Sequence, residues 1–189
     1  MNTLVGIDLQ EDFFTGRLAN PKAQERREAI KKKIREWDGP VVLTQDNHSA
    51  RLYRFSKEGC LPIHCCPDVD VKGWEIPEDI MKAVNAEKNG SKLVARIQKP
   101  TFGFLNWNNA PDYPYLHEAI DQAETITVIG LVSEICVIAN LVILRAMYPN
   151  KRIIWDSTCS AGVPDENGNT PGHEAAKIVA KAQQIEVIE

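Results

Sequence analysis

Three side chains in this sequence, a carboxylate, an amine and a thiol, have the types and positions that covalent chemistry needs. Asp8 directly follows the apolar run Thr3–Ile7, and Lys99 closely follows the run Lys92–Ile97. Cys136 opens an apolar stretch that is expected to be helical. At the start of a helix, a thiol faces unpaired backbone N–H groups and the positive end of the helix dipole, which favour the thiolate. Since an ammonium favours the thiolate further and a carboxylate can accept its proton, the three residues predict a cysteine nucleophile with two assisting groups.

Each of these residues also has an ordinary structural interpretation when it is taken alone. A cysteine such as Cys136 in an apolar helix is usually part of the core, and a lysine before a proline, such as Lys99, is usually exposed. An aspartate after a strand, such as Asp8, usually caps a turn. The catalytic interpretation therefore depends on a fold that brings all three together.

A second set of residues has the composition of a metal site. Asp46 and His48 are two residues apart, and His64 follows in the same segment. One carboxylate and two imidazoles suit a divalent ion, Zn²⁺ above all and also Mn²⁺ or Fe²⁺, with coordination positions left for water or substrate. Two alternatives stay open: both histidines are hydrogen-bonded loop residues, or a structural zinc ion is held by Cys60, His64, Cys65 and Cys66. The second has poor spacing, because it contains no pair of cysteines separated by two residues.

Six short, mostly apolar runs are the expected strands that would position these residues. They are Thr3–Ile7, Val41–Thr44, Lys92–Ile97, Ile126–Ile129, Arg152–Trp155 and Ile185–Ile188. Apolar runs of this length are typical of strands buried on both faces of a parallel sheet. Such a sheet collects its ligands at the carboxyl ends of the strands, where Asp8, Lys99 and Cys136 are all expected.

Helical patterns lie between several of the strands. The expected helices are Pro21–Trp37, Glu78–Ala86, Tyr115–Gln122, Cys136–Met147 and Gly172–Gln184, the last with Thr170 as its N-cap. This alternation predicts a single-domain, three-layer α/β/α sandwich with a mostly parallel six-stranded sheet, a Rossmann-like arrangement, over residues 1–189. The segment 45–73 does not fit the alternation, and we expect it to be an inserted metal-binding loop.

The overall composition narrows the class of protein. A length of 189 residues fits one domain, and a formal net charge of −4 gives no electrostatic reason to expect a nucleic-acid partner. Asp8 interrupts any apolar signal segment, and no apolar run reaches the roughly 20 residues of a membrane span. With five cysteines, an odd number, the chain is expected to be a reduced cytoplasmic protein without a membrane partner.

Taken in order, four stretches of the sequence resemble the isochorismatase-like cysteine hydrolases, the superfamily that includes the nicotinamidases. They are Gly6–Phe14, Thr44–His48, Lys99–Gly103 and Gly130–Val137, and the later stretch Asp156–Gly162 is also similar. The resemblance implies a catalytic triad of Asp8, Lys99 and Cys136. It also implies a cis peptide bond between Leu131 and Val132, and an oxyanion hole formed by the backbone N–H groups of Val132 and Cys136.

The same resemblance implies that Asp46, His48 and His64 hold a metal ion, as in nicotinamidase-like members, where the ion binds the ring nitrogen of nicotinamide. Isochorismatases proper share the fold but lack this site. The substrate pocket is expected to include Phe13, as an aromatic wall, and Leu61. Leu61 stands three residues before His64, where well-studied nicotinamidases often carry Trp, and Arg54 stands where they also carry a further His.

The sequence therefore predicts a metal-assisted cysteine amidohydrolase that releases ammonia from a small amide, with nicotinamide as the leading substrate. The alternatives are a metal-free hydrolase of an isochorismate-like enol ether and a catalytically silent binding or scaffold protein. A nucleotide-binding oxidoreductase is set aside, because no G-x-G-x-x-G motif follows the first strand. Members of the superfamily are often dimers or tetramers, so a homo-oligomer is expected by resemblance.

Overall fold

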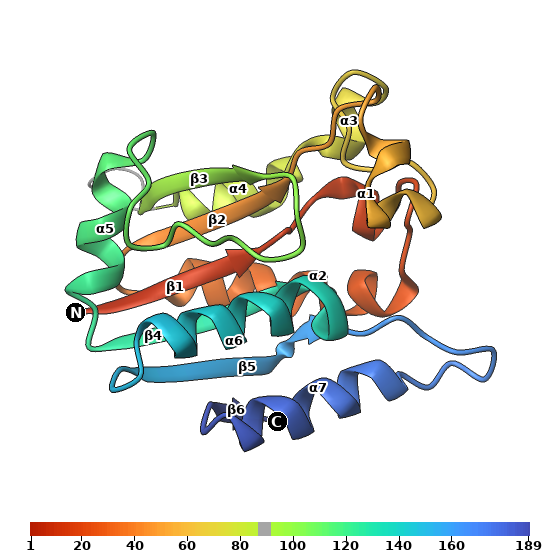
Figure 1. The fold of residues 1–189 in the computed structure, drawn as a ribbon. Helices are drawn as coiled ribbons and strands as arrows, with labels where there is room; N and C mark the ends of the chain where they lie inside the picture. Colours follow the sequence, from red (N-terminus) through yellow and green to blue (C-terminus); the bar gives the residue numbers. More distant parts are fainter. Residues whose placement is uncertain (87–91) are drawn as a thin grey trace.

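The chain folds around one six-stranded sheet, in a computed structural model that describes residues 1–86 and 92–189 (Figure 1). The strands run in the order β3-β2-β1-β4-β5-β6, and every neighbouring pair is parallel. They are β1 (Asn2–Ile7), β2 (Val41–Asp46), β3 (Leu93–Lys99), β4 (Thr125–Leu131), β5 (Arg152–Ala161) and β6 (Glu186–Ile188). The predicted fold class is confirmed, and the sheet is entirely rather than mostly parallel.

Helices cover both faces of this sheet and make the outer layers of the sandwich (Figure 1). The helices are α1 (Glu11–Phe14), α2 (Pro21–Glu36), α3 (Val71–Trp74), α4 (Glu78–Val84), α5 (Pro114–Asp121), α6 (Ile138–Met147) and α7 (Pro171–Ala182). Buried residues of α5, α6 and α7 pack in one core cluster, and those of α2 and α4 pack in a second. Every residue of β2 is buried, which explains why its apolar run is continuous and does not alternate between apolar and polar residues.

The strand β5 is longer than its predicted range of Arg152–Trp155, because polar residues continue it to Ala161. These polar residues are buried with partners: Asp156 forms an ion pair with Lys33 at 2.7 Å, and the Ser157 hydroxyl donates to the Ile188 carbonyl at 2.7 Å. Such partners depend on neighbouring elements, which an apolar run in the sequence does not reveal.

The predicted helix Cys136–Met147 is divided in the structure. A π-helical turn, η3 (Ser133–Val137), precedes α6, and the Val137 N–H bonds the Val132 carbonyl five residues back at 3.2 Å. Cys136 therefore lies inside the π turn and not at the start of an α-helix, which corrects the prediction. Thr170 does occupy the N-cap position of α7, but its side chain makes no capping hydrogen bond to any described residue.

The predicted loop 45–73 begins inside β2 and reaches α3. Between these elements lie two short 3₁₀ turns, η1 (Tyr53–Phe55) and η2 (Lys57–Cys60). The Tyr53 hydroxyl is buried and donates to the Glu58 carbonyl at 2.8 Å, so a hydrogen bond within the segment connects its two turns. In the described part of the chain, no helix has the length and apolar character needed to cross a membrane.

Candidate active site

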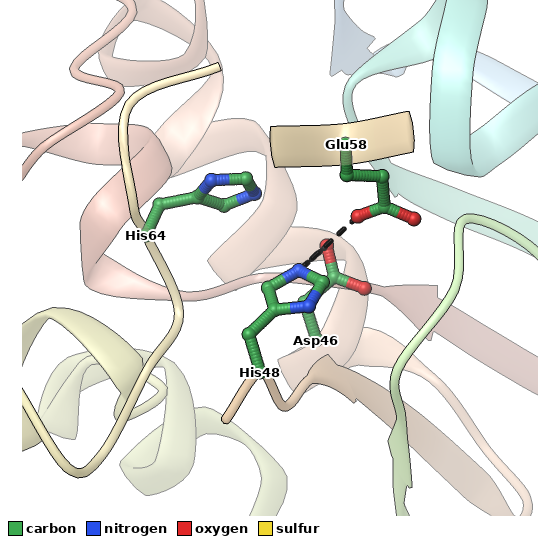
Figure 2. A group of neighbouring side chains, drawn as sticks. All are labelled: Asp46, His48, Glu58 and His64. Carbon is green, nitrogen blue, oxygen red and sulfur yellow. Dashed lines mark ion pairs between the residues drawn. The ribbon is translucent and has the colours of Figure 1, made fainter. Parts of the chain in front are cut away.

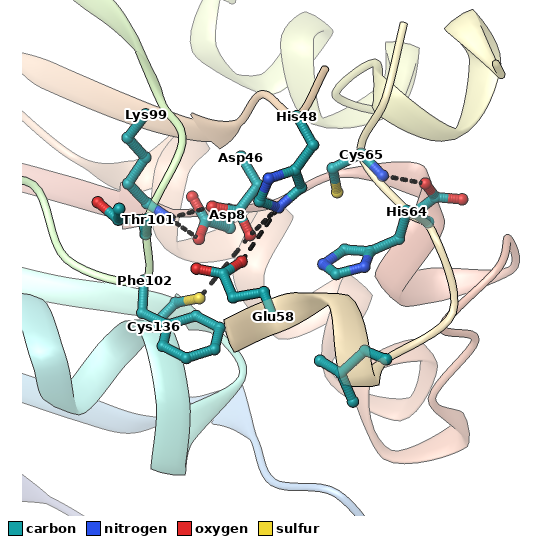
Figure 3. A network of polar contacts seen from close by, with 12 residues as sticks. Asp8, Asp46, His48, Glu58, His64, Cys65, Lys99, Thr101, Phe102 and Cys136 are labelled. Atoms are coloured by element: carbon teal, nitrogen blue, oxygen red, sulfur yellow. Dashed lines mark hydrogen bonds and ion pairs between the residues drawn. The ribbon is translucent and has the colours of Figure 1, made fainter. Parts of the chain in front are cut away.

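The three residues of the predicted triad meet at the carboxyl edge of the sheet (Figure 3). Asp8 directly follows β1, Lys99 is the last residue of β3, and Cys136 lies in the turn after β4. The strand order reverses between β1 and β4, which is the point where open α/β sheets collect their ligands. The fold thus brings together side chains that are 37 to 128 positions apart in the sequence.

The contacts among these residues are short and buried. The Lys99 ammonium lies 2.6 Å from Oδ2 of Asp8 and also forms an ion pair with Oδ1 of Asp46. The Cys136 sulfur lies 4.0 Å from Oδ2 of Asp46, and a carboxylate oxygen of Asp8, one of Asp46 and this sulfur all lie within 4.8 Å of one another. Asp8 and Lys99 are 0% and 1% exposed, so the charges interact in an interior that screens them weakly.

The lysine and the two carboxylates determine one another's charge. Burial alone would lower the pKa of Lys99, but Asp8 and Asp46 raise it well above its usual value, so the amine is an ammonium. Burial and the neighbouring Asp8 raise the pKa of Asp46 to about 7, although Lys99 opposes the rise. The three side chains therefore form one buried charge cluster, in which two carboxyl groups share one ammonium.

The thiol of Cys136 differs from the sequence-based expectation. Burial, and after it the Asp46 carboxylate, raise the pKa of this thiol well above its usual value, while Lys99 lowers it. The expectation that its position favours the thiolate was wrong for the resting protein, because Cys136 is only 3% exposed and a buried sulfur beside two carboxylates is poorly solvated as an anion. A base in contact with the sulfur is consequently needed to generate the nucleophile.

Asp46, His48 and His64 come together, and Glu58 completes a group of four (Figure 2). One donor atom from each lies within 4.8 Å of the others, and all four residues are buried. Glu58 was missed in the sequence, because it is one acid among many and lies in the short turn η2. The alternative zinc set is not supported: among the described residues, no potential metal cluster includes Cys60, Cys65 or Cys66.

The donor atoms of this group fit a divalent ion. Nε2 of His48 and Oε2 of Glu58 are buried 3.2 Å apart, and within the described residues neither makes a hydrogen bond. Nδ1 of His64 lies 2.9 Å from the Pro62 carbonyl and 3.1 Å from the Tyr53 hydroxyl, which leaves Nε2 as its available nitrogen. Burial lowers the pKa of His64, so the ring is neutral, as a metal ligand must be. Buried polar atoms without a partner are costly, and a bound cation would satisfy them.

Three polar side chains, which the sequence marks only as members of the matching stretches, hold this site in place. Thr44 donates its hydroxyl to Oδ1 of Asp8 at 2.6 Å and accepts the Asp8 N–H at 3.1 Å. The Gln10 amide bonds both the N–H and the carbonyl of Asp46, at 2.7 and 2.9 Å. Oδ2 of Asp12 accepts the N–H of Cys65 at 2.6 Å and so anchors the backbone next to His64. Their roles depend on contacts between strands and loops, which spacing in the sequence does not show.

A cavity of about 510 Å³ opens onto Cys136, Asp46 and His64. Phe13 and Leu61, the two residues expected in the substrate pocket, line this cavity, and Phe102 forms a further apolar wall. The cavity is large enough for a small ring compound, and its lining combines apolar walls with a few polar reactive groups. This geometry suits attack by the sulfur on a small apolar molecule that carries one polar reacting group.

The turn that precedes the sulfur has the geometry the sequence predicted. The peptide bond between Leu131 and Val132 is cis, and both Val132 and Cys136 line the cavity. Their backbone N–H groups are the two predicted oxyanion donors. Their proximity to one cavity is compatible with that role, which stays a prediction.

Comparisons with known proteins agree with this arrangement. A family model described as the isochorismatase domain matches residues 2–186. Among curated proteins, none is similar enough in sequence to match this chain.

Solved structures with the same fold include several amidases. The nicotinamidase/pyrazinamidase PncA from Bacillus subtilis has a TM-score of 0.75 at 21% identity, covering 100% of this chain and 99% of that chain. The pyrazinamidase/nicotinamidase from Streptococcus mutans UA159 has a TM-score of 0.76 at 17% identity and covers 100% of both chains. The pyrazinamidase of Pyrococcus horikoshii in complex with zinc has a TM-score of 0.71 at 19% identity, covering 100% of this chain and 98% of that chain. At these identities the likeness establishes the fold.

Proposed function

The chain belongs to the isochorismatase family, and from this premise we propose that it is a metal-assisted cysteine amidohydrolase that releases ammonia from a small amide, with nicotinamide as the leading substrate. The observation that carries the proposal is the buried contact of a thiol, two carboxylates and an ammonium, of which the thiol and the Asp46 carboxylate line a cavity. Neighbours of the same fold named as nicotinamidases and pyrazinamidases support the choice of substrate class. The triad residues are Asp8, Lys99 and Cys136.

In the proposed reaction, Asp8 accepts the proton of the Cys136 thiol while Lys99 holds Asp8 in place. Asp8 is the available base, because Asp46 is shared with the metal-binding group. The sulfur attacks the amide carbonyl, and the N–H groups of Val132 and Cys136 stabilise the negative oxygen that forms. Asp8 then returns the proton to the departing nitrogen, the C–N bond breaks, and ammonia leaves a thioester on Cys136. Water hydrolyses the thioester to the carboxylic acid and restores the thiol.

The four residues Asp46, His48, Glu58 and His64 are proposed to hold the divalent ion, with Zn²⁺ as the leading identity. A neighbour of the same fold is a pyrazinamidase in complex with zinc, which supports this identity. When bound, such an ion would supply a Lewis-acid centre that can orient the substrate ring. The apolar walls formed by Phe13, Leu61 and Phe102 would then hold the flat face of the ring.

The test of this function is ammonia release by the purified protein after chelation and after return of Zn²⁺ or Mn²⁺. Nicotinamide is expected to be hydrolysed in the metal-loaded protein. Benzamide has the same shape without a ring nitrogen, so it is expected to be hydrolysed more slowly if the ion orients the ring. If the protein instead cleaves an isochorismate-like enol ether without metal and releases no ammonia from any amide, the amidohydrolase proposal is wrong. The protein would then be an enol-ether hydrolase. Absence of turnover on both substrate classes would favour a binding role.

The metal-binding group predicts which variants lose the ion. Asp46→Ala is expected to reduce bound metal from about one ion per chain to almost none, because it removes a buried charged ligand. Glu58→Gln is expected to retain metal but to bind it roughly tenfold more weakly or worse, because the fourth ligand loses its charge. Elemental analysis and competition with a chromogenic chelator measure the two effects.

The matched control is Asn47→Ala, because Asn47 lies between two of the proposed ligands and its side chain bonds Gln98 at 3.0 Å instead. It is expected to bind metal as the unmodified protein does. Unchanged metal content in Asp46→Ala would reject the proposed ligand set.

A further inference from the structure

The turn that carries Val132 and Cys136 is held from behind by the first turn of α7. We propose that His173 is a positioning residue of the reaction, which acts through Ser133 to keep the Val132 N–H aimed at the reacting carbonyl. This inference rests on the proposed function, because the oxyanion role of the Val132 N–H is part of that function. Its test uses the thiol chemistry of Cys136 and does not depend on the identity of the amide.

The central contact is a buried hydrogen bond between Ser133 and His173. Oγ of Ser133 lies 2.7 Å from Nδ1 of His173, and the two residues are 0% and 8% exposed. Ser133 directly follows Val132, so its side chain fixes the backbone next to the proposed oxyanion donor. Burial lowers the pKa of His173, so the ring is neutral and offers one donor and one acceptor nitrogen.

Glu134, the next residue of the turn, is held by the same part of the fold. Its Oε1 accepts the N–H of Val163 at 2.8 Å, and Val163 lines the cavity. The carboxylate packs against α7 so closely that a Cβ on Gly172 would lie 2.5 Å from Oε1. A Cβ on Gly162 would lie 2.8 Å from the Cβ of His173. The turn and the start of α7 are thus packed without spare room, which limits how far Ser133 can move.

The other side of the turn is held by β5. Oγ of Ser160 accepts the Gly130 N–H at 3.1 Å and the indole N–H of Trp155 at 2.9 Å. The Trp155 ring in turn packs edge-on against His173, with centroids 5.5 Å apart. Ser160 and His173 therefore fix the residues on both sides of the Leu131–Val132 peptide. Trp155, Ser160 and His173 are not among the residues that line the cavity, so their effect must come through the position of the turn.

The experiment compares two reactions of the same sulfur in the holoenzyme. Acylation by 4-nitrophenyl acetate passes through a negative carbonyl oxygen and needs the oxyanion donors, whereas alkylation by iodoacetamide does not. In His173→Leu, the acylation rate is expected to fall at least about tenfold, while the alkylation rate stays within about twofold. A purely structural defect would slow both reactions or reduce the fraction of reactive protein, which mass mapping of Cys136 measures.

Three further variants make the result specific. His173→Asn can still bond the Ser133 hydroxyl and is expected to recover most of the acylation rate. Ser133→Ala removes the same hydrogen bond by a smaller change and tests the inference even if His173→Leu does not fold. Glu174→Gln is the control, because Glu174 is the neighbouring residue on α7 and its side chain is 66% exposed.

Equal loss of both reactions in His173→Leu and Ser133→Ala, or unchanged acylation in both, overturns the positioning role. Failure of the proposed function is seen separately, as absence of ammonia release from amides by the unmodified protein. In that case the two thiol reactions still decide whether His173 positions the turn.

Discussion

Cys136→Ala is expected to abolish ammonia release from nicotinamide while the protein stays folded. The substitution removes the protein atom that is proposed to bond to the substrate carbon, and loss of a nucleophile of this kind commonly costs a factor on the order of 10⁴ to 10⁶ in kcat. Stability is expected to change by no more than about 1–2 kcal/mol, because the side chain is small and its raised pKa keeps it neutral. An ammonia assay and thermal unfolding measure the two effects.

The control for this variant is Cys60→Ala, because Cys60 is exposed and lies outside the residues that line the cavity. It is expected to keep full activity. Ammonia release at the unmodified rate in Cys136→Ala would exclude the sulfur as the nucleophile and would remove the central step of the proposed mechanism.

Lys99→Met is expected to cause the largest loss of stability among single substitutions in the site. The ammonium is buried between the carboxylates of Asp8 and Asp46, and methionine would leave these acids without their cation. Breaking a buried pair from one side typically costs about 3–5 kcal/mol, because the remaining charge is neither solvated nor paired. Urea denaturation of the metal-free protein measures this loss, and ammonia release is expected to be lost as well.

A double substitution separates the charge effect from the loss of packing. Lys99→Met combined with Asp8→Asn is expected to be more stable than the sum of the single effects predicts, since it removes one of the stranded charges. Lys82→Met is the matched control, because the Lys82 side chain is 71% exposed and its ion pair with Glu78 lies at the surface. If Lys99→Met is no less stable than Lys82→Met, the buried charge cluster does not have the energetic role assigned to it.

Much of the architecture could be predicted because the sheet is buried on both faces. Apolar runs marked every strand, and residues at their ends, such as Asp8 and Lys99, had to meet at one edge once the strands were parallel. Strand ends with polar residues could not be placed in this way. The continuation of β5 depends on Lys33 and on the Ile188 carbonyl, which belong to other elements.

Only those site residues that have a recognisable type and spacing could be predicted from the sequence. Asp46 and His48 form a recognisable pair, but Glu58 joins them through the path of a loop with no periodic pattern. The shift of the Cys136 pKa was also beyond the sequence, because it arises from burial beside Asp46, on another strand. Gln10 likewise stabilises Asp46 through hydrogen bonds that exist only when β1 and β2 lie in their observed register.

The double use of Asp46 separates maturation of this protein from its folding. Lys99 forms an ion pair with that carboxylate, so the interior can close around Asp46 before an ion is bound. Small zinc-dependent domains differ, because they stay unfolded until their metal arrives. The ion proposed for this site would bind a polypeptide that has already folded, so metal supply would govern how much of the protein is active without governing how much is made.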